Sequence, residues 1–147
     1  MVDFDEISAR LLAETQEAII YATRDGVIRF WNGGAEELFG FSAGEALGKS
    51  LDIIIPEKHR NAHWDGWDRV MDSGNTRYGS EPLNVPGIKA DGSTMSLEFS
   101  ITILKDDDGT IEGIAAFLRD VTTKWNEKKA LRVQIKELER QIEDASG

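Results

Sequence analysis

Two histidines, His59 and His63, are the residues of this chain best suited to bind a metal-containing group, and both lie in the segment 56–74. The spacing within this segment predicts a helix in which His63, Trp67 and Val70 share one face. An imidazole therefore lies in the middle of an otherwise apolar helical stripe. Such a histidine is either a hydrogen-bonded residue of the core or an axial ligand of a bound cofactor, and the segment alone supports both interpretations.

Other chemistry finds little support in the sequence. His59 and His63 are four residues apart, so they share a helical face and offer two ligands to a metal ion. The nearby Asp65 points away from that face, which disfavours a dedicated metal site. The sequence also lacks the motifs of a serine nucleophile elbow, a phosphate-binding glycine loop and a zinc protease helix. The prediction is a ligand-binding protein that is not an enzyme.

Composition excludes further classes of function. The 147 residues carry a formal net charge of -10, which argues against nucleic acid as a partner because phosphates attract basic surfaces. The chain has no cysteine, which excludes disulfides, cysteine-based zinc sites and flavin–cysteinyl photochemistry. No apolar run has the length of a membrane span and no signal peptide opens the chain, so we expect a cytoplasmic protein with no membrane partner.

Helix and strand signals follow one another in a simple order. A helix over 3–17 is followed by a hairpin around Asp25-Gly26, and Asn32 and Ser42 then cap two short helices. Three strands follow, of which the first contains prolines that interrupt its ladder, so it is expected to be bent or at an edge. The predicted strands are 18–22, 27–31, 77–85, 94–104 and 111–118. This order predicts an α+β domain, a five-stranded antiparallel sheet with short helices on one face.

The chain divides into three predicted regions, which are a flanking helix over 1–17, the domain over 18–122 and a C-terminal helix over 123–147. The last helix carries a heptad-like seam, apolar except at one lysine, formed by Trp125, Lys128, Leu131, Ile135, Leu138 and Ile142. Burial of this seam stabilises too little to hold an isolated helix of this length, so the helix needs a partner. We expect a homodimer through the N- and C-terminal helices, and the alternative is a helix folded back on its own sheet.

The run 25–49, DGVIRFWNGGAEELFGFSAGEALGK, resembles the signature half of a PAS domain. Asp91-Gly92-Ser93 and the run 119–122, Arg-Asp-Val-Thr, are similar to later landmarks of the same family, so the resemblance covers roughly residues 16–123. It implies a PAS fold that holds a small ligand or cofactor between the helices and the sheet. It also implies a sensor that passes its state through the segment 119–122 to the C-terminal helix and to a downstream signalling protein.

The region around His63 resembles the haem-binding PAS domains of bacterial oxygen sensors. Those domains carry a proline, then Arg-x-x-His, then a helix that ends in glycine, as Pro56, Arg60, His63 and Gly74 do here. This resemblance implies haem b, with His63 as the axial ligand of the iron and Arg69 beside a haem propionate. Cations for the propionates cluster around this segment as Lys58, Arg60, Arg69 and Arg77. The predicted cofactor-binding residues are His63, Trp67, Arg69, Val70, Tyr78, Leu83, Phe99, Ile101 and Ala115.

The sequence departs from the oxygen sensors on the predicted bent strand. Those proteins place there an arginine that holds bound gas or a methionine that serves as a sixth iron ligand, and Leu83 and Glu81 occupy these positions here. Three interpretations therefore stay open. The domain binds haem, or it binds a small apolar ligand or metabolite, or it is a dimerisation module with no cofactor or with a non-covalent flavin.

Overall fold

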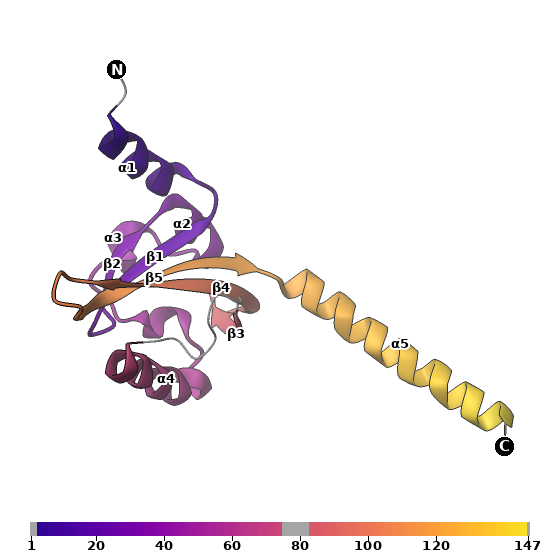
Figure 1. Ribbon diagram of the computed structural model, residues 1–147. Helices are drawn as coiled ribbons and strands as arrows, with labels where there is room; N and C mark the ends of the chain where they lie inside the picture. The colour runs from indigo at the N-terminus through magenta and orange to yellow at the C-terminus, as the bar shows by residue number, and fades with distance from the viewer. Residues whose placement is uncertain (1–2, 75–82, 147) are drawn as a thin grey trace.

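The structure is a computed structural model that describes residues 3–74 and 83–146. Its centre is a five-stranded antiparallel sheet in the order β2-β1-β5-β4-β3 (Figure 1). The strands are β1 Ala18–Thr23, β2 Ile28–Trp31, β3 Leu83–Ile88, β4 Thr94–Lys105 and β5 Ile111–Asp120. The predicted α+β class and the five-stranded antiparallel sheet are therefore confirmed.

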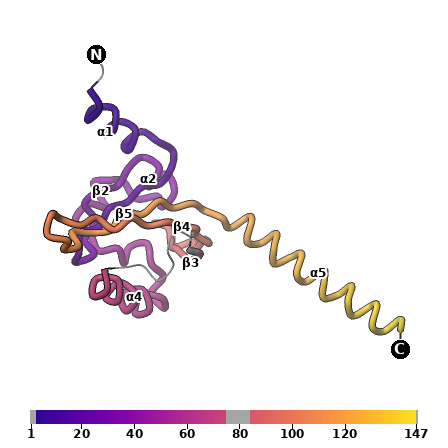
Figure 2. Tube along the Cα trace, viewed as in Figure 1, coloured from indigo at the N-terminus to yellow at the C-terminus, as the bar shows by residue number. Residues whose placement is uncertain are grey.

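Most of the helical segments lie between β2 and β3 along the chain, as the tube in Figure 2 shows. The α-helices are α1 Phe4–Glu14, α2 Gly33–Phe39, α3 Ala43–Ala46, α4 Arg60–Ser73 and α5 Thr122–Ser146, and the 3-10 helices are η1 Leu51–Ile54 and η2 Glu57–His59. The segment predicted as one helix from residue 56 is thus a 3-10 turn followed by α4. Gly74 ends α4 in the left-handed conformation, with φ of 73°, as predicted.

Asn32 joins three elements through four hydrogen bonds. Its side-chain oxygen accepts the backbone N–H of Ala35 at 3.0 Å, which caps α2 as predicted, and that of Ile19 in β1 at 2.9 Å. Its amide nitrogen donates to the carbonyls of Leu12 and Glu17 at 2.8 Å each. Asn32 is buried, and these four bonds satisfy all of its donors and acceptors, so it fixes the end of α1 to the sheet and to α2.

The strand β3 differs from its prediction. Residues 77–82 of the predicted strand lie outside the described residues, and the observed strand continues through Pro86 and Gly87, which pair with Ser96 and Met95 of β4. The expected edge position is confirmed. The expected interruption is wrong at Pro86 and Gly87. Among the described strands β3 pairs with β4 alone, and a proline in an edge strand directs its missing N–H away from the ladder.

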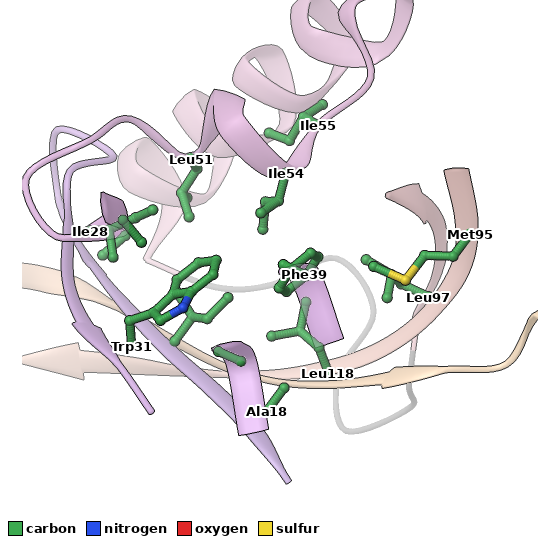
Figure 3. Packing of buried hydrophobic residues seen from close by; sticks show 14 residues of the cluster. Ala18, Ile28, Trp31, Phe39, Leu51, Ile54, Ile55, Met95, Leu97 and Leu118 are labelled. Carbon is green, nitrogen blue, oxygen red and sulfur yellow. The ribbon is translucent and has the colours of Figure 1, made fainter. Parts of the chain in front are cut away.

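The core lies between one face of the sheet and the helices that cover it. Figure 3 shows Phe39 of α2 at its centre, between Trp31 and Ile54 on one side and Leu97 and Leu118 of the sheet on the other. Phe39 has no exposed surface, and its ring centroid lies 5.4 Å from that of Trp31. Full burial of a side chain of this size stabilises the fold by about 2–3 kcal/mol.

The two terminal helices leave most of their apolar side chains exposed. Figure 1 shows α5 extending away from the sheet, with no other described element beside it. No described helix has the length and hydropathy needed to span a membrane. The large exposed apolar residues of these helices are Phe4, Ile7, Leu11 and Leu12 in α1, and Trp125, Leu131, Val133, Ile135, Leu138 and Ile142 in α5.

Candidate functional site

Two tryptophans attach α4 to the rest of the domain. The indole N–H of Trp64 donates to Oδ1 of Asp52 on η1 at 2.7 Å, and that of Trp67 donates to the carbonyl of Arg24 in the β1–β2 turn at 2.8 Å. The Trp64 ring packs on Gly26 of the same turn so closely that a Cβ there would collide with it. Gly26 has a φ of 78°, which glycine adopts without strain.

His63 lies between these two tryptophans. Its ring centroid is 4.5 Å from that of Trp64, in an edge-to-face arrangement, and 5.9 Å from that of Trp67. Its Nδ1 atom is buried and has no hydrogen-bond partner. Burial lowers the pKa of His63 below the ordinary value for histidine, and the negative charge of Asp52 opposes this with a smaller effect. The imidazole is therefore neutral at neutral pH, the form that donates a lone pair to a metal.

The face of α4 that carries His63 is only partly covered. His63, Trp67 and Val70 share this face, as predicted, and each is half-buried. None of the fourteen residues of α4 is fully buried. Trp64 and Trp67 nevertheless pack against the core cluster, so this helix belongs to the layer that covers the inner face of the sheet.

The opposite wall is formed by half-buried strand residues. Phe99 and Ile101 of β4 pair with Leu118 and Ala116 of β5, so these four side chains share the inner face of the sheet. Ala115 pairs with Tyr21 and Thr102 and faces the other side. The prediction that Ala115 lines the same wall is therefore wrong, because successive residues of a strand alternate between faces, and Ala116 takes that place.

The structure also describes some of the cations predicted to pair with the haem propionates and part of the predicted bent strand. Arg69 is exposed on α4, while Arg60 donates to the carbonyls of Ile55 and Asp52 and so holds the corner between η1 and α4. The backbone of Leu83 pairs with that of Phe99. Its side chain lies outside the described residues, as do Arg77, Tyr78 and Glu81.

The sequence reasoning missed two residues of this site, Trp64 and Asp52. Trp64 is adjacent to His63 but lies off the predicted stripe, and its docking surface is a turn that is distant in sequence. Asp52 is the single charged residue in the apolar segment 51–55, and a lone carboxylate in such a segment is the signal that was available.

The donor groups decide which kind of metal-containing group fits. Within residues 3–74 and 83–146, no group of three or more histidine, aspartate or glutamate side chains is arranged to hold a metal ion. A porphyrin brings four nitrogen ligands of its own, so haem needs as few as one donor from the protein. A neutral, half-buried His63 that lies between Trp64 and Trp67 meets this requirement.

Known proteins share the fold of this chain and part of its sequence. A family model described as PAS fold matches residues 12–124. The chain is 26% identical over 132 residues to the sensor protein FixL of Bradyrhizobium diazoefficiens, a match that covers 90% of this chain and 25% of that protein. It is 23% identical over 128 residues to the oxygen sensor protein DosP of Escherichia coli, covering 87% of this chain and 16% of that protein.

A solved structure shows the same fold. The PAS domain of a protein from Colwellia psychrerythraea matches with a TM-score of 0.73 at 19% identity, over 82% of this chain and 99% of that one. The chain spans a quarter or less of the length of the two sensor proteins.

Proposed function

The chain belongs to the PAS family, and from this premise we propose that it is a sensory domain that binds haem through His63 and passes the state of the bound group to its flanking helices. The family is generally sensory rather than catalytic. One relative is named an oxygen sensor protein, and the segment 56–74 resembles haem-binding members of the family. Haem binds oxygen, so these two observations together favour haem over other ligands.

One observation carries this proposal: His63 is a neutral imidazole whose Nδ1 is buried without a partner. A histidine with a purely structural role in the core is normally hydrogen-bonded. This one is positioned by ring contacts with Trp64 and Trp67, which fix its orientation without using its nitrogens. No described residue therefore forms a hydrogen bond with the nitrogens of this ring, so they are available for a further bond.

The surroundings of His63 suit a flat apolar group with charged edges. Phe99, Ile101 and Ala116 offer an apolar surface on the sheet, and Val70 offers one on α4. The exposed guanidinium of Arg69 is available to pair with a carboxylate. When bound, haem would supply an iron centre whose open coordination position takes a diatomic gas. The residues of this chain would hold the macrocycle, exclude water from it and pair with its carboxylates.

A haemin titration of purified protein tests the proposal. The wild type should develop a Soret band with one equivalent of haemin, and His63→Ala should lose most of it while keeping its far-ultraviolet circular dichroism. His59→Ala is the matched control, because it removes the other histidine and should keep the band. Equal bands in the wild type and His63→Ala, or no band in any protein, would contradict haem ligation by His63. The latter result would favour a metabolite-binding domain or a cofactor-free interaction module.

A second component of the proposal is a homodimer formed through α5. The seam residues Leu131, Ile135 and Leu138 are each more than half exposed, at 57%, 53% and 53%. This helix of 25 residues has no buried residue, so it needs another helix to bury such a seam. A second copy of this chain supplies an identical seam.

The start of α5 is fixed to the sheet, so the two can move together. Oδ1 of Asp120 accepts the backbone N–H of Thr122 at 2.9 Å, and the Thr122 hydroxyl accepts the backbone N–H of Ser96 in β4 at 2.9 Å. Arg119 also pairs with Glu17, just before β1, at 3.3 Å. A shift in β4 or β5 would therefore reach α5 directly through these hydrogen bonds. A shift in β5 would also reach the segment between α1 and β1 through the ion pair of Arg119 with Glu17.

Sedimentation analysis tests the dimer. The full chain should sediment as a dimer at micromolar concentration, and truncation after Thr123 should shift it toward monomer. Ile135→Glu, which places a charge in the seam, should have the same effect, while Lys136→Glu beside the seam should not. A monomeric full chain at high micromolar concentration would exclude the coiled coil.

A further inference from the structure

The carboxylate of Asp52 is fixed by Trp64, the residue that follows His63. Its Oδ1 accepts the indole N–H of Trp64, whose ring meets that of His63 edge-on. The backbone carbonyl of Asp52 in turn accepts a hydrogen bond from Arg60 at 3.3 Å. Two side chains of α4 thus hold the same residue of η1, one at its carboxylate and one at its backbone.

The His63 ring lacks a hydrogen-bond partner that Asp52 is suited to provide. Nδ1 of His63 is buried and unpaired, and buried polar atoms in folded proteins are nearly always paired, with the protein or with water. Asp52 lies close enough for its negative charge to act on the pKa of His63. Trp64 engages Oδ1, and a carboxylate accepts hydrogen bonds at both of its oxygens.

We propose that Asp52 is a positioning residue for His63, accepting the Nδ1–H hydrogen of the imidazole through one water and so leaving the free lone pair on Nε2. The inference rests on the proposed function in one respect, which is that Nε2, with its free lone pair, is the atom that would bind the haem iron. A carboxylate bonded to the far nitrogen of a ligating histidine fixes its tautomer and increases its basicity.

The first test uses the protein without haem. Nitrogen-15 NMR distinguishes the two neutral tautomers of histidine. At neutral pH the wild type should hold His63 mainly as the Nδ1–H form, and Asp52→Ala should shift it toward the Nε2–H form that free histidine prefers. Trp64→Phe, which keeps a ring but removes the N–H that holds Asp52, should shift it part of the way.

Controls separate this role from a structural one. Asp65→Ala removes an exposed carboxylate two residues from His63 and should leave the tautomer unchanged. Near-ultraviolet circular dichroism confirms that each variant is folded. If Asp52→Ala does not fold, Asp52→Asn, in which an isosteric amide replaces the carboxylate, takes its place in the measurement. The same tautomer in the wild type and in the folded Asp52 variant, or an equal shift in Asp65→Ala, would overturn the inference.

The second test uses protein loaded with haemin. Loss of the Asp52 carboxylate should weaken haem affinity about 10–100-fold, the usual effect of removing such a partner of a metal ligand, and should lower the iron–imidazole stretching frequency. Unchanged affinity and frequency in Asp52→Ala would overturn the role of Asp52 while leaving haem binding intact. A wild type that binds no haemin would refute the proposed function, and the tautomer measurement would still decide the role of Asp52.

Discussion

The helical layer that covers the sheet has two halves that pack in different ways. In the half formed by α2, Ala35 and Phe39 have no exposed surface, and Asn32 caps the helix with all of its hydrogen bonds satisfied. In the half formed by α4, no residue is fully buried, and two indole N–H groups connect the helix to η1 and to the β1–β2 turn.

This difference agrees with the proposed division of the domain into a part that folds and a part that binds a ligand. The half around α2 is packed to the density of an ordinary core and needs nothing further. In the half around α4, His63, Trp67 and Val70 are each half-buried, and so are Phe99 and Ile101 on the inner face of the sheet. Partly covered apolar side chains of this kind suit the lining of a ligand-binding site.

Truncation of one apolar residue in each half should show the largest contrast. Phe39→Ala removes the fully buried ring at the centre of the core and should lower the free energy of unfolding by about 3–5 kcal/mol. Val70→Ala on α4 should cost about 1 kcal/mol or less, because the side chain is half-buried and alanine favours a helix. Urea unfolding measures both. Equal costs at the two positions would show that α4 is packed like the core.

A smaller effect is expected at the surface on which α4 docks. Gly26→Ala places a Cβ against the Trp64 ring and strains a positive φ, so it should cost about 1–2 kcal/mol for the backbone plus the displacement of the indole. Gly92→Ala is the matched control, because Gly92 has a φ of 86° with open space around it. Gly26→Ala alone should shift tryptophan fluorescence to the red, and equal spectra and stabilities in both variants would argue against this docking.

The smallest effect concerns pH. Because burial holds the pKa of His63 below its value of about 6.5 in the unfolded chain, the folded state binds fewer protons. The stability that results is fully present above pH ~6.5 and is lost as the pH falls from there through the lowered pKa. The free energy of unfolding measured in urea should therefore fall more steeply between pH 7 and pH 5 in the wild type than in His63→Ala. Parallel slopes in the wild type and His63→Ala would contradict the lowered pKa.

Much of the fold could be predicted because its signals are local. The turn at Gly26, the caps at Asn32 and Ser42 and the strand over 94–104 each depend on residues close together in sequence, and each is found in the structure. The predicted wall residues Phe99 and Ile101 share one face of β4. Ala115 lies on the other face of the sheet, because the sequence did not fix which face of β5 continues that of β4.

The site could be predicted only in part. The helical stripe of His63, Trp67 and Val70 follows from periodicity, so it was visible in the sequence. The docking of Trp64 on Gly26 and of Trp67 on Arg24 depends on residues about 40 positions apart, and no local pattern records it. The hydrogen bond from Trp64 to Asp52, which brings Asp52 toward His63, is likewise not recorded by a local pattern.

The central claim, that the half around α4 is completed by a ligand held at His63, is tested most directly by hydrogen exchange with and without haemin. Without haemin, the backbone amides of α4 should exchange much faster than those of β5, because α4 has no buried side chain to hold it closed. One equivalent of haemin should slow the exchange in α4 of the wild type and should not change it in His63→Ala. Exchange in α4 that is as slow as in β5 before haemin is added, or that haemin leaves unchanged in the wild type, would contradict the account.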